Sequence, residues 1–242
     1  ITINNPKKKN ALNQEAYKDL TKALNDAAQN DSVKVAVITG AGDIYSSGND
    51  LSQALTSTET IEERLRKSSM VLKELIRAFY KFPKLLIGIV NGPCIGIAAT
   101  TIALCDLIYA VDSAYFYTPF TALGLCAEGC SSYTFPKILG KSKASEMLLL
   151  NYKLSAMEAL KYGFVADVYN RSEFDTKIWP KIVAYSKLAP GSIRVTKELM
   201  QKFEMNILDE VCEAETKALS QRWHSDEVME GFMNFMSRKS KM

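Results

Sequence analysis

The sequence lacks the features that mark several classes of protein. It has no apolar run of the roughly 18 residues that a membrane helix needs. Its 30 basic and 27 acidic residues leave a formal net charge of only +3, and like charges form a run only at Lys7, Lys8 and Lys9. A nucleic-acid-binding protein usually concentrates positive charge on one face. We therefore expect neither a membrane nor a nucleic acid as a partner.

Patterns that bind metal ions are also missing. The five cysteines show no paired spacing of the zinc-binding kind, and their mostly apolar neighbours indicate reduced, packed thiols in a reducing compartment. The single histidine, His224, lies in the C-terminal region and is interpreted as a surface or interface residue. We expect no metal site.

The sequence does contain enough apolar residues for a full core, since 47% of its 242 residues are hydrophobic. Strands are expected at residues 1–4, 33–39, 85–90, 106–111, 115–117 and 164–169, and helices at 13–28, 59–80, 96–104, 129–139, 143–150 and 155–162. Their alternation predicts an α/β core with a mostly parallel sheet. From Phe174 onward the pattern is helical only. We expect a core at residues 1–185 and a C-terminal helical region at 186–242, within the same domain, that serves packing and oligomerisation.

One carboxylate, Glu128, stands in an apolar segment, residues 123–130. Its neighbours Leu123, Leu125 and Ala127 cannot form an ion pair with it. Burial disfavours the charged form and raises the pKa of a carboxyl group, which makes it a useful base near neutral pH. The alternative is that Glu128 only places a favourable charge at a helix N-terminus.

Two glycine-containing turns give further access to the backbone. The strand at 33–39 leads into a loop of small residues at 40–51, and the turn Asn91-Gly92-Pro93 leads into a small apolar helix that Gly96 opens. Glycine lets a ligand approach the backbone, and the free N–H groups of a helix N-terminus favour negative charge.

The motifs at residues 45–51, 90–93, 117–120 and 128–137 read YSSGNDL, VNGP, YTPF and EGCSSYTFPK. Together they resemble the crotonase superfamily, the enoyl-CoA hydratases and isomerases, and are most similar to the peroxisomal 3,2-trans-enoyl-CoA isomerases. The resemblance runs from Ile3 through Val165 and more loosely into the C-terminal helices. It implies the crotonase fold, a spiral of ββα units with a mostly parallel sheet, followed by a C-terminal helical appendage.

This resemblance implies an enzyme that shifts a 3-cis or 3-trans enoyl-CoA double bond to the 2-trans position during β-oxidation of unsaturated fatty acids. The implied catalytic groups are the Glu128 carboxylate as the base and the N–H groups of Asn49 and Ile97 as an oxyanion hole. The implied substrate-binding residues are Ser46, Ser47, Gly48, Asn49, Asp50, Leu51, Gly96 and Phe120. An acyl-CoA thioester is the expected partner, and no cofactor is expected because CoA is part of the substrate.

Two departures from the hydratase pattern favour isomerisation. Hydratases of the family use two carboxylates to activate water, and the matching positions here are Thr100 and Phe120. A second interpretation also follows from the resemblance, because chromodomain-linked corepressors of this subgroup use the fold as a non-catalytic module that binds CoA or proteins. Retention of Glu128 favours the enzyme.

The resemblance also implies a homotrimer or a dimer of trimers. The C-terminal residues Ser240-Lys241-Met242 are similar to the Ser-Lys-Leu peroxisomal signal, which predicts a peroxisomal location, with the mitochondrion as the alternative. We expect the chain to begin inside a longer protein, where members of this subgroup can carry an upstream acyl-CoA-binding domain.

Overall fold

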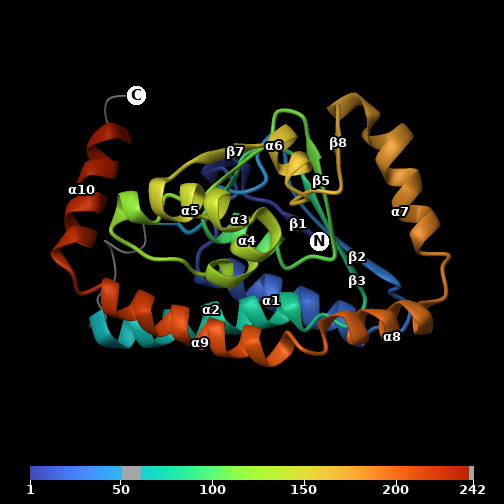
Figure 1. Ribbon diagram of the computed structural model, residues 1–242, viewed down its shortest axis with the longest axis horizontal. Helices are drawn as coiled ribbons and strands as arrows, with labels where there is room; N and C mark the ends of the chain where they lie inside the picture. The colour runs from blue at the N-terminus through green and yellow to red at the C-terminus, as the bar shows by residue number, and fades with distance from the viewer. Residues whose placement is uncertain (51–60, 240–242) are drawn as a thin grey trace.

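A parallel sheet of five strands lies at the centre of the computed structural model, which describes residues 1–50 and 61–239 (Figure 1). Its strands are β1 (Thr2–Ile3), β2 (Val35–Gly40), β3 (Leu85–Val90), β5 (Leu107–Val111) and β8 (Asp167–Tyr169). They pair in the order β1-β2-β3-β5-β8, and every pair is parallel. Five of the six residues of β3 are buried, as expected for a strand with both faces covered. The predicted mostly parallel sheet is confirmed.

A second, smaller sheet contains strands that the sequence pattern only partly revealed. It consists of β4 (Cys94–Ile95), β6 (Tyr115–Tyr117) and β7 (Lys153–Ser155). Strand β6 pairs in parallel with β4 and antiparallel with β7. The sequence analysis predicted β6 and missed β4 and β7.

Helices surround both sheets. They are α1 (Gln14–Gln29), α2 (Ile61–Tyr80), α3 (Ile97–Ile102), α4 (Ser131–Leu139), α5 (Lys141–Leu150), α6 (Ala156–Lys161), α7 (Trp179–Tyr185), α8 (Pro190–Gln201), α9 (Met205–Arg222) and α10 (Asp226–Lys239). Short turns of 3-10 or π helix occur at η1 (Pro6–Lys8), η3 (Thr121–Leu123), η4 (Arg171–Glu173) and η5 (Phe174–Ile178). As predicted, the Asn13 side chain caps α1 by accepting a hydrogen bond from the Ala16 N–H at 2.8 Å. All six residues of α3 are buried.

Several predicted boundaries were wrong by two or three residues, and for two of them the structure shows the cause. Helix α4 begins at Ser131 rather than at Gly129, because Gly129 and Cys130 both adopt positive φ angles, 69° and 61°. Strand β8 begins at Asp167 rather than at residue 164. The N–H groups of Phe164 and Val165 instead donate to the Ala159 carbonyl and complete the end of α6.

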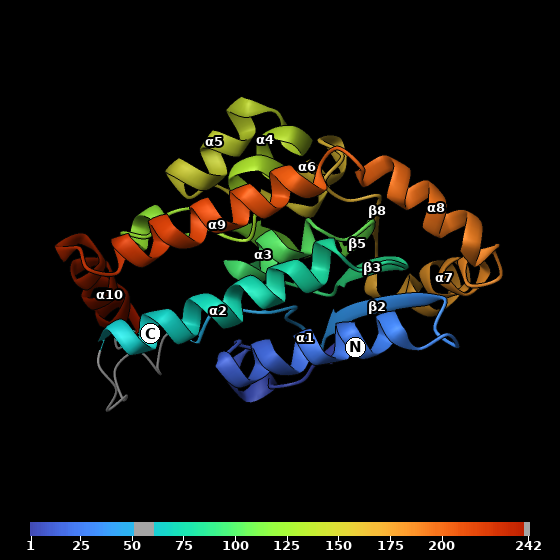
Figure 2. The ribbon, with the colours of Figure 1, turned by 90° about the horizontal axis from the view of Figure 1, so that it is seen from below.

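The C-terminal helices cover the core. Helix α9 packs on α2 and on α4, and α2 lies between α1 and α9 (Figure 2). Helices α7 and α8 lie at one end of the molecule and α10 at the other (Figure 1). Within residues 1–50 and 61–239, none of the helices combines the length and hydropathy of a transmembrane segment. The division into a core and a C-terminal region at residue 185 stays a prediction.

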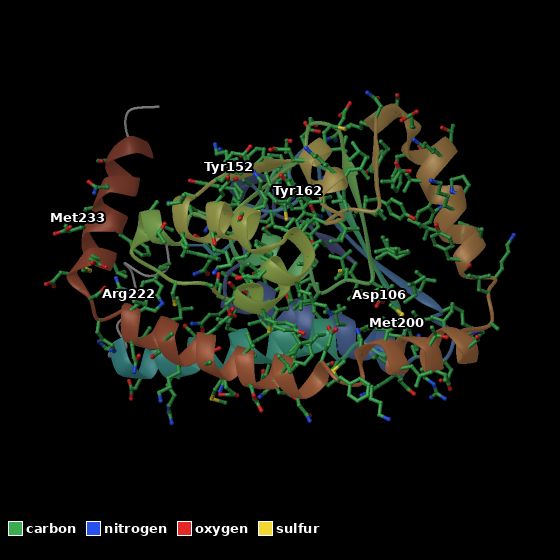
Figure 3. All side chains as sticks on the ribbon, viewed as in Figure 1. Asp106, Tyr152, Tyr162, Met200, Arg222 and Met233 are labelled. Carbon is green, nitrogen blue, oxygen red and sulfur yellow. The ribbon has the colours of Figure 1, made fainter. Side chains whose placement is uncertain are left out.

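A buried ion pair joins α8 to the central sheet. The Lys197 ammonium lies 2.6 Å from the Asp106 carboxylate and donates to the Lys84 carbonyl at 2.9 Å. The same Asp106 oxygen accepts the N–H of Leu86 at 2.8 Å. Figure 3 shows Asp106 in the interior beside α8. Because both partners are largely shielded from water, with 8% and 19% of their side chains exposed, the loss of one leaves the other poorly solvated.

We expect Lys197→Met to lower the free energy of unfolding by about 2 kcal/mol, because methionine keeps the apolar stem but leaves Asp106 without its cation. The cost is smaller than for a fully buried pair because Asp106 keeps the Leu86 N–H. Urea unfolding followed by circular dichroism measures the change in the free energy of unfolding. Arg194→Met is the matched control, since Arg194 on the same helix lies 3.9 Å from Glu198 in an exposed pair and should cost less than about 1 kcal/mol. Equal costs for the two variants would contradict a stabilising role for the buried pair.

Candidate active site

Buried polar groups hold the loop after β2 in a fixed shape. The Asn10 side chain is fully buried and donates to the carbonyls of Ala41 and Ile44 at 2.9 and 2.7 Å. The Ser46 hydroxyl donates to the Asn10 carbonyl at 2.7 Å and accepts the Gly48 N–H at 3.1 Å. The hydroxyl of Ser46 is therefore used within the loop, where it orients the turn at Gly48. A contact of Ser46 with substrate stays a prediction.

The two glycine turns of the sequence lie against each other. Gly48 has a φ of +81°, and a Cβ at this position would lie 2.6 Å from the Ile95 carbonyl oxygen and 3.6 Å from the Gly96 Cα. Gly96 has a φ of +59°, and its Cβ would lie 4.0 Å from the Gly48 Cα. The Ile95 N–H also donates to the Ser46 carbonyl at 3.0 Å. Both positions need glycine for their positive φ, and Gly48 needs it for the close approach as well.

The residues after these glycines are Asn49 and Ile97, the two predicted oxyanion donors. Ile97 is the first residue of α3, where backbone N–H groups have no partner within the helix. The preceding N–H, that of Gly96, donates to the Tyr117 carbonyl at 2.8 Å. In the part of the chain that the structure describes, neither the Asn49 N–H nor the Ile97 N–H donates a hydrogen bond. Two unpaired donors therefore follow two adjoining turns.

The loop that carries Glu128 packs directly on α3. Gly129 has a φ of +69°, and a Cβ there would lie 2.2 Å from the Thr100 hydroxyl oxygen, 2.7 Å from the Thr100 Cβ and 3.4 Å from the Ile97 Cδ1. Only glycine leaves room for this contact. The loop that carries Glu128 and the helix that begins at Ile97 therefore lie side by side. That the Glu128 carboxylate and the N–H groups of Asn49 and Ile97 converge on one point stays a prediction.

The positions where hydratases carry carboxylates hold buried, uncharged residues. Thr100 is fully buried and its hydroxyl donates to the Ile97 carbonyl at 3.1 Å. Phe120 is 3% exposed at the start of η3. Neither side chain can activate a water molecule as a base.

Glu128 titrates far from the ordinary range of a carboxyl group. Its pKa is raised to about 8, first by burial and then by the negative charge of Glu215. The residue is not fully enclosed, because part of its surface stays exposed to solvent. A group with this pKa is half-ionised near pH 8 and can act as a base there.

Glu215 is the residue of this site that the sequence analysis missed. It lies on α9, and its two carboxylate oxygens accept the N–H of Cys130 at 2.7 Å and the N–H of Ser132 at 2.8 Å. Burial raises its pKa, and these hydrogen bonds oppose the increase. A signal was present, because Glu215 interrupts an apolar stripe at helical spacing formed by Leu208, Cys212 and Leu219.

The remaining predicted substrate contacts lie in the same loop as Gly48. The N–H groups of Ser47 and Asp50 donate to the carbonyls of Lys9 and Leu12, at 3.0 and 2.8 Å. The Asp50 carboxylate also pairs with Lys8 at 2.9 Å. Leu51 and the terminal segment 240–242 lie outside the described residues.

Comparison with known families and proteins shows which sequences and structures the chain is similar to. Residues 1–241 match the family described as Enoyl-CoA hydratase/isomerase. "Enoyl-CoA delta isomerase 2" of Rattus norvegicus is 46% identical over 100% of this chain and 62% of its own length. "Enoyl-CoA delta isomerase 3, peroxisomal" of Mus musculus is 43% identical over 100% of this chain and 76% of its own length. The chain therefore spans about three fifths of the rat relative.

Solved structures show the same fold. The enoyl-CoA hydratase/isomerase from Pseudoalteromonas atlantica superposes with a TM-score of 0.89 at 29% identity, covering 98% of this chain and 92% of its own. The fold expected from the sequence motifs is confirmed.

Proposed function

The chain belongs to the enoyl-CoA hydratase/isomerase family, and from this membership we propose that it is an isomerase of fatty-acid metabolism. The proposed reaction moves the double bond of a 3-cis or 3-trans enoyl-CoA to the 2-trans position. The observation that carries this proposal is the Glu128 carboxylate of raised pKa, on a loop that packs against α3, together with the unpaired N–H groups of Asn49 and Ile97. The names of the rat and mouse relatives support the same reaction class.

The proposed mechanism needs one base and one anion site. The Glu128 carboxylate removes a proton from C2 of the substrate, and the electrons move to the thioester oxygen to form an enolate. The N–H groups of Asn49 and Ile97 donate to that oxygen; such a donor typically contributes about 3 kcal/mol to stabilising the transition state. The protonated Glu128 then returns the proton at C4, and the double bond forms between C2 and C3. No proton is lost or gained overall.

Hydration is not proposed for this site. Addition of water across a double bond needs groups that orient and activate the water molecule, and Thr100 and Phe120 occupy the places where family hydratases keep them. The contact between Gly129 and Thr100 also fills the space beside α3. One carboxyl group that exchanges a proton between two carbons is sufficient for isomerisation if the site stays dry.

We expect kcat/KM for a 3-enoyl-CoA to rise as the pH increases through about 8 and then to reach a plateau. The direction follows because Glu128 acts as a base only when ionised, and it is protonated below its pKa. Initial rates measured between pH 6 and pH 10, with the fold checked by circular dichroism at each end, give the profile. A rate that is constant below pH 8, or falls as the pH rises towards 8, would contradict the assignment of Glu128 as the base.

A direct assay tests the proposed function. The purified protein is incubated with a 3-enoyl-CoA, and formation of the conjugated 2-enoyl thioester is followed by its ultraviolet absorbance. Conversion supports the isomerase. Tight binding of CoA esters without any shift of the double bond would instead favour a non-catalytic CoA-binding module of the corepressor kind.

We also propose a peroxisomal location. The printed name of the mouse relative supports it, and a fusion of the C-terminal residues to a fluorescent protein would test it. The remaining expectations, a trimeric assembly and the absence of a cofactor, stay predictions that sedimentation of the purified protein and turnover without additives can check.

A further inference from the structure

The C-terminal helices hold the beginning of the loop that carries Glu128. The Arg222 side chain at the end of α9 donates to the Gly124 carbonyl at 2.8 Å and pairs with Glu227 of α10. A Cβ on Gly124 would lie 2.6 Å from the backbone of Glu227, and one on Gly231 would lie 2.7 Å from the backbone of Leu123. Helix α10 therefore rests directly on this segment, and Figure 3 shows Arg222 at the corner between α9 and α10.

The same helix α9 holds the end of the loop. Glu215 is 7% exposed, and its two oxygens accept the N–H groups of Cys130 and Ser132 at the start of α4. Cys130 has a φ of +61°, a conformation that a non-glycine residue rarely adopts. The two hydrogen bonds to Glu215 stabilise this conformation, and Glu128 lies two residues before it.

Glu215 also acts electrostatically on the Glu128 carboxyl. Among the described residues, the groups that interact electrostatically with Glu128 are Glu215 of α9, Tyr17 of α1 and Cys126 of the loop itself. Burial raises the pKa of Tyr17 and of Cys126, so both are neutral near pH 7. The Arg222 cation acts on Cys126. Glu215 is therefore the charged side chain that most affects the Glu128 carboxyl.

The negative charge of Glu215 is not cancelled by a cation. The groups around it are the thiols of Cys130 and Cys212, both fully buried, and no salt bridge of the described residues includes Glu215. Two backbone N–H donors at a helix N-terminus favour the ionised form of a carboxyl group. Burial raises the pKa of Glu215, and these two hydrogen bonds oppose the increase. Among the described residues, no hydrogen bond to the Glu128 carboxylate opposes its raised pKa in this way.

We propose that Glu215 is the positioning residue of this active site, which holds the Glu128 loop at Cys130 and Ser132 and places a carboxylate beside that loop. The catalytic part of this inference rests on the proposed isomerase function. A residue of the C-terminal helical region would then act in the reaction through Glu128, rather than only in packing.

The test compares substitutions at two glutamates of α9. Glu215→Gln removes the charge and one acceptor, so we expect the midpoint of the kcat/KM profile to fall by roughly one pH unit, the plateau of kcat to fall about tenfold, and KM to change little. Glu215→Asp keeps the charge but retracts it by one methylene, so kcat should fall while the midpoint moves less. Glu213→Gln is the matched control, because Glu213 is 51% exposed and pairs with Lys73 and Arg77 away from the loop; its profile should match the wild type.

A measurement without turnover separates this inference from the proposed function. Infrared titration of the Glu128 carboxyl, obtained as the difference between each protein and its Glu128→Gln counterpart, should show the same fall of the midpoint in Glu215→Gln. If the wild type does not isomerise but this shift is present, the proposed function fails and the inference stands.

If Glu215→Gln folds and the midpoint of the Glu128 titration is the same as in the wild type, the inference is overturned, whatever the rate of turnover. A purely structural role would lower kcat in both Glu215 variants and leave both midpoints unchanged, which also overturns it. If Glu215→Gln does not fold, Glu215→Asp decides the question, and an unchanged kcat together with an unchanged midpoint rejects the inference.

Discussion

Glu128→Gln should reduce isomerisation of a 3-enoyl-CoA by about 10² to 10⁴-fold while leaving the affinity for CoA esters nearly unchanged. Glutamine keeps the size and polarity of the side chain, so the loop packing at Gly129 is retained. It cannot accept the C2 proton, and the positions where family hydratases carry their carboxylates are Thr100 and Phe120 here. Steady-state kinetics and calorimetric titration with a saturated acyl-CoA measure the two effects.

Thr100→Ala is the comparison variant for this experiment. The Thr100 hydroxyl only donates to the Ile97 carbonyl within α3, so its removal should change the rate by less than about tenfold. If Glu128→Gln kept nearly normal turnover, or if both variants lost the same activity, Glu128 would not be the base.

Glu128→Gln should also stabilise the protein at high pH. The folded-state pKa of Glu128 is raised to about 8, so the stability that the protonated carboxyl provides is lost as the pH rises from the ordinary glutamate range through 8. Glutamine has no such titration. The melting temperature of Glu128→Gln should therefore exceed that of the wild type by a margin that grows as the pH rises towards 8. Such a gain in stability on loss of a catalytic group is typical of active sites, where function is kept at a cost in stability.

Most of the fold could be predicted because its elements carry local signals. The α1 cap at Asn13 and the apolar runs that became β2, β3 and β5 are visible within single segments. The start of α4 was missed because the left-handed turn at Cys130 forms with a contact from a distant segment, Glu215 of α9. The start of β8 was missed because the N–H groups of Phe164 and Val165 extend the end of α6, which their apolar, strand-like pattern does not show. A cysteine at positive φ is not expected from sequence, and it occurs here with Glu215 hydrogen-bonded to its N–H.

The candidate site could be predicted only in part. The apolar neighbours of Glu128 correctly indicated a raised pKa, since burial is its largest cause. The second cause, Glu215, lies far along the chain on a helix that the sequence pattern assigned to packing. Local periodicity shows which face of α9 is buried but not which loop that face contacts.

Gly48→Ala should lower kcat by about 10²-fold, the typical effect of losing one oxyanion donor. A Cβ at this position would lie 2.6 Å from the carbonyl oxygen of Ile95 in β4. Because β4 pairs with β6, Ile95 cannot move away to make room. The turn must therefore move away from Gly96, and the Asn49 N–H moves with it. KM should change less than kcat, because the lost hydrogen bond strengthens only as charge develops on the thioester oxygen.

Gly42→Ala separates displacement of the turn from simple backbone strain. Gly42 lies in the same loop with a φ of +72°, but a Cβ there has no atom within 4 Å. This variant carries the left-handed strain of about 1 kcal/mol without moving Asn49, so its kcat should stay near that of the wild type. In Gly96→Ala the added Cβ would have its nearest neighbour, the Gly48 Cα, 4.0 Å away. The kcat of this variant should lie between those of Gly48→Ala and Gly42→Ala. Melting temperatures measured in parallel correct for loss of fold. If the Gly48 and Gly42 variants were equally active, the N–H of Asn49 could not be a donor to the oxyanion, and the anion site would have to be built around Ile97 alone.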